Sequence, residues 1–284
     1  MPQKIIVVNE ETGESKEIYG EVVEEGSGDK IIRAGTVEYL KEQSRHYEDK
    51  TSFVWVMFQY DTPLFPELSQ SDLTRLMYFS TFCTASGYVM HKKDVRNTLR
   101  INANQLSAFS ADLQNAGIIH NANDVYCLDS RFFSIGEIKT ELNYIRLFCD
   151  STRELYEGCV STAEHKTLSY IFKMIPYVNR QTNILSYNQE EQAKDAIIFM
   201  PFSKFCTLVD YDATHAARLR KALLQYRING ELAVGFFDDL TQLTDSGSYV
   251  LVNPRLFFGG LRTTSTYQEI CTLFAAEREI HEQS

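Results

Sequence analysis

Histidines and cysteines are the side chains of this chain that could hold a metal or act as nucleophiles. The six histidines are far apart, at His46, His91, His120, His165, His215 and His281. The chain contains no His-Glu-x-x-His, Gly-x-Ser-x-Gly or phosphate-binding glycine loop. The acidic pair Asp238-Asp239 has the sequence context of a turn rather than of a metal site. We therefore expect no enzyme, no catalytic residue, no metal site and no cofactor.

The cysteines indicate a reduced environment. No two of the six are spaced Cys-x-x-Cys, so we expect mostly buried free thiols at Cys83, Cys127, Cys149, Cys159, Cys206 and Cys271. No apolar run approaches the roughly 18 residues needed to cross a bilayer. The N-terminal Met1-Pro2-Gln3-Lys4 lacks the apolar stretch of a secretory signal. We expect a protein of the bacterial cytoplasm that makes no membrane contact.

A second set of side chains is suited to contacts with nucleic acid. Amides pair with adenine and guanidinium groups pair with guanine in the major groove, and basic side chains neutralise phosphates. Side chains of these types lie in the first turns of some of the expected helices or next to those helices. The candidate DNA-binding residues are Lys92, Lys93, Asn104, Gln105, Thr214, His215, Arg218, Lys221 and Arg227. The alternative for each helix is an ordinary solvated face.

The net charge of −10 opposes this interpretation, because nucleic-acid binders are usually basic. The acidity is concentrated at the two ends, however. Residues 1–50 hold twelve acidic against seven basic side chains, and residues 265–284 hold four against one. Residues 91–120 instead carry four basic against two acidic side chains, and residues 202–227 carry five against two. Both candidate segments are therefore basic islands in an acidic chain.

One pattern occurs twice, at about 73–136 and 168–260. Leu99, Ile101, Leu106, Phe109 and Leu113 align without a gap with Val209, Tyr211, Ala216, Leu219 and Leu223. Tyr126-Cys127-Leu128 and the following Arg131-Phe132-Phe133 match Tyr249-Val250-Leu251 and Arg255-Leu256-Phe257-Phe258. The order of a helix, a short helix, a turn, a second helix and a hairpin is that of a winged helix-turn-helix.

Local sequence features predict the elements of the first copy. Ser71 or Asp72 is expected to cap a helix that continues to about Thr84, and a short strand covers 88–90. Helices follow at 92–99 and from Asn102, which forms a capping box with Gln105. Residues 118–128 form the candidate wing. Apolar residues spaced by three and four predict a connecting amphipathic helix from Ile135 to Glu157, buried between the copies or against a second copy of the chain.

The second copy has similar features. Ser161 and Glu164 form a capping box, and the helix that they begin is expected to stop near Pro176. A short strand covers 183–186, Pro201 suits the first turn of the next helix, and Asp212 caps a helix to about Tyr226. Strands at 231–237 and 249–252 enclose a turn, and the last helix covers 267–281.

The expected fold class is α+β and mainly helical, with two winged helix-turn-helix domains joined by a helix and preceded by a β-hairpin segment. That segment has a strand at 4–8 and a returning strand at 18–23, followed by a Gly-Ser-Gly loop at 26–28 and a helix at 36–48. Residues 53–58 suit either a buried strand or a core helix. The expected divisions are an N-terminal segment, 1–50; a first winged-helix domain, 51–136; a connecting helix, 137–160; a second winged-helix domain, 161–262; and a C-terminal helix, 263–284.

Several segments resemble a known group. They are Asn183-Ile184-Leu185-Ser186-Tyr187-Asn188, Phe205-Cys206, Val209-Asp210-Tyr211-Asp212, His215-Ala216-Ala217-Arg218-Leu219 and the stretch from Tyr249 to Gly260. This part is similar to tandem winged-helix proteins of Firmicute plasmids and phages, the replication-initiator-like group. The resemblance covers about 165–260 closely and 73–136 more loosely. It implies binding of double-stranded DNA in replication initiation or transcriptional control.

Two further partners remain open. An acidic phage protein could use a winged-helix scaffold to bind or inhibit a host protein, with residues 1–50 contacting a basic surface. A second copy of the chain, forming a homodimer, is the other alternative.

Overall fold

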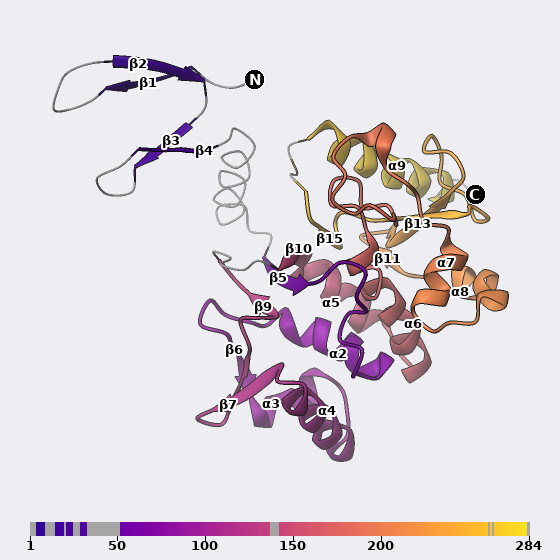
Figure 1. The fold of residues 1–284 in the computed structure, drawn as a ribbon. Helices are drawn as coiled ribbons and strands as arrows, with labels where there is room; N and C mark the ends of the chain where they lie inside the picture. Colours follow the sequence, from indigo (N-terminus) through magenta and orange to yellow (C-terminus); the bar gives the residue numbers. More distant parts are fainter. Residues whose placement is uncertain are drawn as a thin grey trace. The chain divides into compact units, whose positions relative to one another are not determined.

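The computed structural model describes four N-terminal strands and residues 52–136, 142–260, 262 and 264–282 (Figure 1). Two compact units are present. One comprises 1–50 with 261–263, and the other comprises 51–260 with 264–284. The two repeat copies therefore belong to one compact unit.

The smaller unit contains two antiparallel hairpins. Strand β1 (Lys4–Val8) pairs with β2 (Ser15–Tyr19), and β3 (Glu21–Glu24) pairs with β4 (Asp29–Ile32). The predicted first hairpin is confirmed. The expected returning strand instead divides, because Val22 and Val23 belong to the second hairpin, whose strands flank the Gly-Ser-Gly sequence. The helix expected at 36–48 lies outside the described residues.

A four-stranded antiparallel sheet joins the two repeat copies. Its order is β15 (Phe257–Phe258), β10 (Asn143–Phe148), β5 (Phe53–Phe58) and β9 (Phe133–Ser134). All six residues of β5 are buried, which settles 53–58 as a strand. Trp55 lies opposite Arg146 in the central pair; β9 pairs with Trp55 and Val56, and β15 pairs with Arg146 and Leu147. This register gives the sheet an approximate two-fold axis at the Trp55–Arg146 pair.

The first copy contains the predicted helices and hairpin. Its elements are α2 (Gln70–Ser80), β6 (Tyr88–His91), α3 (Lys92–Thr98), α4 (Ala103–Asn115), β7 (Ile119–Ala122) and β8 (Val125–Leu128). The strands are ordered β6-β8-β7. The capping box of Asn102 and Gln105 is confirmed. Helix α2 is capped by Ser69, not by Ser71 or Asp72, because the Ser69 hydroxyl accepts the Asp72 N–H.

The second copy repeats this order. Its helices are α6 (Thr162–Phe172), η1 (Ile175–Tyr177), η2 (Lys194–Ala196), α7 (Phe202–Leu208), η3 (Ala213–His215) and α8 (Ala216–Leu223). Its strands are β11 (Arg227–Ile228), β12 (Glu231–Leu232), β13 (Val234–Phe237) and β14 (Tyr249–Val252). Ile184 bridges to Leu251 of β14, so the strand order matches that of the first copy. Pro201 is the N-cap of α7 rather than a first-turn residue.

Burial and backbone geometry agree between the copies. In both aligned sets of five apolar residues, the first, fourth and fifth are buried and the other two are half-buried. The turns between the paired helices also match, because Arg100 and Asp210 adopt positive φ values of 53° and 57°. One residue separates each from a cap, Asn102 or Asp212. The predicted pair of consecutive helices within 92–116 is confirmed.

The single connecting helix expected from Ile135 to Glu157 is wrong. Among the described residues of this stretch, 143–148 form strand β10 and helix α5 begins only at Cys149 (Cys149–Gly158). Ile145, Arg146 and Leu147 are consecutive buried residues, because both faces of this central strand are covered. The spacing of apolar residues by three and four is therefore compatible with a helix. Residues 143–148 form a strand instead, because they pair with β5.

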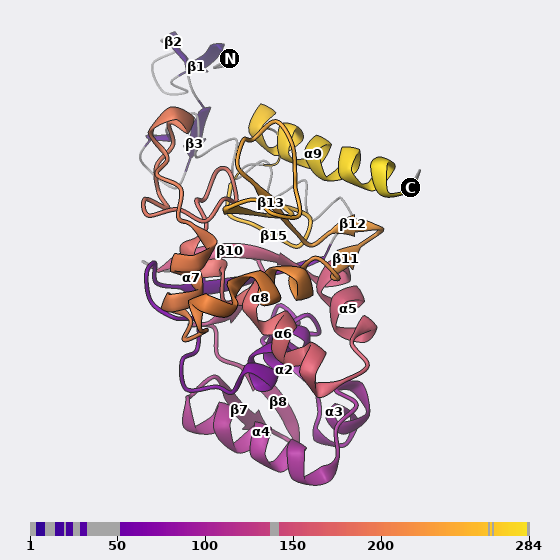
Figure 2. The ribbon, with the colours of Figure 1, turned by 90° about the vertical axis from the view of Figure 1, so that its right-hand side faces the viewer.

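Helices α2 and α6 contact each other at the junction of the copies, and α5 contacts both (Figures 1 and 2). The Thr74 hydroxyl donates to the His165 carbonyl at 2.7 Å across this contact. The buried face of α5 is thus covered within the chain. The predicted last helix is confirmed as α9 (Ser265–Glu282), which buries Ile270 and Phe274. In the described part of the chain, no helix has the length and apolar character to span a membrane.

Candidate nucleic-acid interface

The start of the helix pair η3–α8 is organised by Asp212. Its carboxylate accepts the Thr214 N–H at 2.9 Å and the Thr214 hydroxyl at 2.7 Å, and it lies 3.2 Å from Nδ1 of His215. The hydrogen bonds from Thr214 lower the pKa of Asp212, so its carboxylate is ionised at neutral pH. Thr214 and His215 are exposed, but both side chains contact the capping residue.

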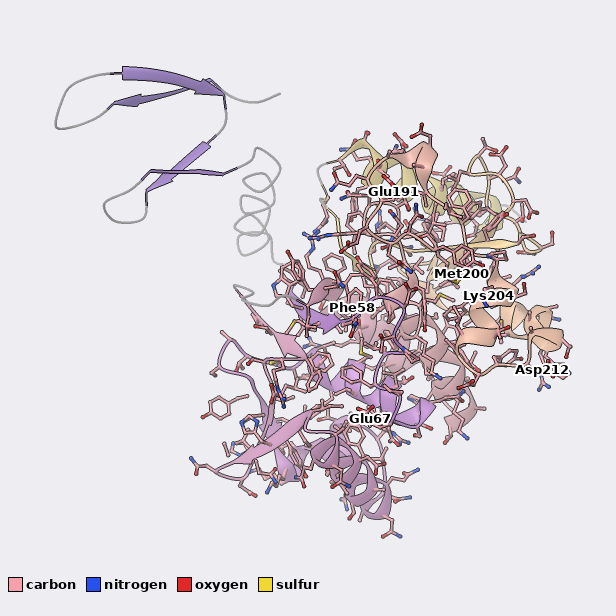
Figure 3. The ribbon with its side chains drawn as sticks, viewed as in Figure 1. Phe58, Glu67, Glu191, Met200, Lys204 and Asp212 are labelled. Carbon is pink, nitrogen blue, oxygen red and sulfur yellow. The ribbon has the colours of Figure 1, made fainter. Side chains whose placement is uncertain are left out.

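Arg218 and Lys221 occupy the outer face of α8. Both side chains are exposed, whereas Leu219 and Leu223 on the opposite face are buried. Among the described residues, neither cationic group has a hydrogen-bond or ion-pair partner. The nearby helix α7 adds exposed Lys204, which Figure 3 labels on the same side of the molecule as Asp212. These cations are therefore available to an anionic partner.

Arg220 has a different role from its two basic neighbours. Its guanidinium donates to the Ser246 carbonyl at 2.7 Å and lies over the Phe236 ring at 5.4 Å. It thus fastens the loop at 238–248, between β13 and β14, to α8. Its sequence position between Arg218 and Lys221 does not distinguish this anchoring role from ligand contact.

The loop at 238–248 carries three aspartates, Asp238, Asp239 and Asp245, and no lysine or arginine. The Ser248 N–H donates to Asp238 at 2.9 Å, and this bond lowers the pKa of that carboxyl group. The negative charge of this loop disfavours its contact with a phosphate.

Arg227 does not join the cluster on α8. Its guanidinium pairs with Glu277 of α9 at 3.2 Å and donates to the Gly230 carbonyl at 2.9 Å. These contacts hold the β11–β12 hairpin against α9. The structure therefore places Arg227, one of the expected DNA-binding residues, in contacts within the chain.

In the first copy, two of the four candidate side chains have partners within the chain. Gln105 is half-buried and its side chain accepts the Asn102 N–H at 3.0 Å, as part of the capping box. Lys92 lies 3.7 Å from Asp124, with its ammonium over the Tyr126 ring. Asn104 on α4 and Lys93 on α3 are exposed. The exposed candidate cations of the second copy thus lie on α8, whereas α4 carries no lysine or arginine and exposes Asp112.

The other chemically capable groups do not converge. All six cysteines are free, and five of them are buried, as predicted. Within the described residues, no group of three or more His, Cys, Asp or Glu side chains could hold a metal ion. Comparison with protein-family models, curated proteins and solved structures finds no match to this chain.

Proposed function

We propose that this protein binds double-stranded DNA through two winged-helix modules, in replication initiation or transcriptional control of a phage or plasmid. Helix α8 lies in the major groove in this proposal, where Arg218 reads a guanine and Lys221 holds a phosphate. Helix α4 makes the weaker second contact through Asn104, with Lys93 near the backbone.

The exposed pair of cations on α8 carries this proposal. Arg218 and Lys221 follow a capped turn, lie opposite a packed apolar face and have no partner within the described residues. The repeated strand order supports the module assignment, because a hairpin whose second strand is central follows the helix pair in both copies. In helix-turn-helix proteins, the second helix of such a pair lies in the major groove.

Salt dependence of duplex binding tests the proposal. A fluorescently labelled random-sequence duplex is titrated with the full chain at about 50 and 200 mM salt, and anisotropy is recorded. We expect affinity to fall steeply, with a log-log slope of about −0.9 for each phosphate neutralised. Absence of duplex binding at the lower salt concentration would contradict the proposal.

Binding to a host protein is a second candidate function, favoured by the acidic loop at 238–248 and the net charge of −10. A basic protein surface would be attracted to these aspartates, whereas DNA would be repelled. The substitution of Asp238 and Asp239 by asparagine separates the two functions. Tighter duplex binding by this variant supports DNA contact near the loop, and unchanged duplex binding leaves the loop available to a protein partner.

A further inference from the structure

A cavity of about 510 Å³ lies between the second repeat copy and α9, within the larger compact unit. Its walls come from the segment around η2, from the loop at 238–248 and from α9. This volume lies in the range of about 300–1,000 Å³ that is usual for small-molecule sites. The cavity is distant in sequence from Arg218 and Lys221, and neither residue lines it.

The cavity wall is mainly apolar with a few hydrogen-bonding groups. The apolar side chains are Ile184, Ile197, Phe199, Leu240, Ile270 and Leu273. Hydroxyl and amide groups come chiefly from α9, at Ser265, Thr266, Gln268 and Thr272. Apolar walls with a small number of polar groups on one element favour a ligand with an apolar body and one polar end.

The charges at the cavity indicate an uncharged ligand. Among the described residues that line it, only Lys194 and Glu269 are charged, and their groups pair at 2.8 Å. Their side chains are 51% and 62% exposed, so the pair lies at the solvent side of the wall. The two charges cancel. An ionised ligand would have to displace one partner of this pair, whereas an uncharged ligand leaves the pair intact.

We propose that this cavity binds a small, uncharged, mostly apolar molecule with one hydroxyl group, such as an aliphatic alcohol or a phenol. The apolar body lies against Phe199, Ile270 and Leu273, and the hydroxyl bonds to the polar groups of α9. The proposal does not depend on DNA binding, because it involves other residues.

Calorimetric titration of the full chain with three eight-carbon probes tests the ligand class. The probes are 1-octanol, octanoate and octylammonium, which share one tail and differ in charge. We expect saturable binding of 1-octanol and at least tenfold weaker binding of both ions. Equal or tighter binding of octanoate or octylammonium, or no saturable binding of 1-octanol, would overturn the proposal.

Variants locate the probe in the cavity. Leu273→Trp fills the space and should abolish octanol binding, whereas Val160→Trp, at a highly exposed position outside the cavity wall, should leave it unchanged. Thr272→Phe blocks the same space from an exposed position, in case the first variant does not fold. Octanol binding that survives in both folded cavity variants would refute this site.

A third variant tests the role of the Lys194–Glu269 ion pair. Lys194→Met leaves Glu269 without its partner, so octylammonium should bind at least tenfold more tightly while octanol binding is retained. No gain for octylammonium would refute the claim that the ion pair selects an uncharged ligand. All of these ligand titrations are carried out without DNA. A negative result therefore contradicts the ligand site and not the proposed binding of duplex DNA.

Discussion

Arg218, Arg220 and Lys221 lie within four positions of one another, but they meet different surroundings. Successive residues of a helix are separated by about 100°, so neighbours in sequence face different directions. Arg220 is half-buried against Phe236 and the loop carbonyl of Ser246, whereas Arg218 and Lys221 face outward. By charge alone, all three side chains would be expected to contact a ligand. The contacts of Arg220 show instead that it holds the loop at 238–248 against α8.

Arg218→Ala and Lys221→Ala should weaken DNA binding in different ways. Loss of Arg218 should cost about 1–3 kcal/mol and relax preference at one base pair, because a bidentate base contact is lost. Loss of Lys221 should weaken binding evenly across sequences and reduce the salt slope by about one unit. Anisotropy titrations against a selected duplex and its single-base variants measure both effects.

Lys166→Ala is the matched control, because Lys166 is also an exposed helical lysine, on α6. It changes the net charge equally and should leave duplex affinity almost unaltered. Unchanged affinity in the Arg218 and Lys221 double variant, with a native circular dichroism spectrum, would remove α8 from the interface.

His165 lies at the junction between the two repeat copies. Its ring packs edge-on against Tyr156 at 4.5 Å, Nδ1 lies 2.9 Å from the Ser161 carbonyl, and buried Nε2 has no partner among the described residues. Burial lowers the pKa of His165, and the charge of Arg75 acts in the same direction. The folded chain therefore favours the neutral imidazole.

This shift predicts a loss of stability in mild acid. The unfolded chain takes up a proton near the ordinary histidine pKa of about 6.5, whereas the folded chain resists protonation to lower pH. The contribution of His165 is complete above about pH 6.5 and declines as the pH falls through that value toward the folded pKa. Urea unfolding of wild type and His165→Phe at neutral and mildly acidic pH should show a smaller decline for the variant. His91→Gln, at an exposed position, serves as the control; an equal decline in wild type and His165→Phe would contradict this role.

At the scale of the element, the paired helices of the two copies are joined by turns of the same construction. A residue with positive φ lies in the turn, one half-buried residue, Ile101 or Tyr211, follows, and a polar cap begins the next helix. The cap satisfies backbone N–H groups that have no partner within the first turn of a helix. The amide of Asn102 and the carboxylate of Asp212 do this in the two copies.

Removal of either cap should therefore destabilise the protein by a similar amount. Asn102→Ala and Asp212→Ala should each lower the free energy of unfolding by about 0.5–2 kcal/mol. Chemical denaturation measures this change, with Asn115→Ala, at an exposed position near the end of α4, as the control. A stability equal to wild type in both cap variants would show that these side chains do not hold their helices.

At the scale of the whole molecule, one sheet and one helix pair connect the repeat copies. Strand β5 precedes the first copy and β10 precedes the second, and the two strands pair along their full length. Helices α2 and α6 contact each other beside this sheet. The copies therefore share a continuous hydrophobic core, so we expect the described part of the larger unit to unfold cooperatively.

Leu147→Ala tests this cooperativity. Leu147 is fully buried opposite Val54 in the central pair, so its truncation should cost about 2–5 kcal/mol. Amide hydrogen exchange of β8 and β14, one strand in each copy, should accelerate by the same factor. Acceleration in only one of these strands would show that the copies unfold independently.

Local sequence features determined much of the helical structure. The capping boxes at Asn102 and Ser161 and the matched apolar residues of the two copies predicted their helices correctly. The helix expected from Asp212 to about Tyr226 is instead divided into the 3-10 helix η3, which Asp212 caps, and α8, which ends at Leu223. The same helical register that buries Leu219 and Leu223 turns Arg218 and Lys221 outward. These properties depend on residues within one or two turns of each other, so the chemical information that sets them is local.

Tertiary contacts decided what local patterns left open or misassigned. Residues 53–58 and 143–148 are strands because they pair with each other, although they lie about 90 residues apart in the chain. The apolar pattern within each segment gives no information about this distant partner. Arg227 pairs with Glu277 across 50 residues, and Arg220 anchors a loop 26 residues away. Sequence determines which side chains carry charge, but only the fold determines which of those charges already has a partner, because ion pairs and strand ladders join residues that are close in space and distant along the chain.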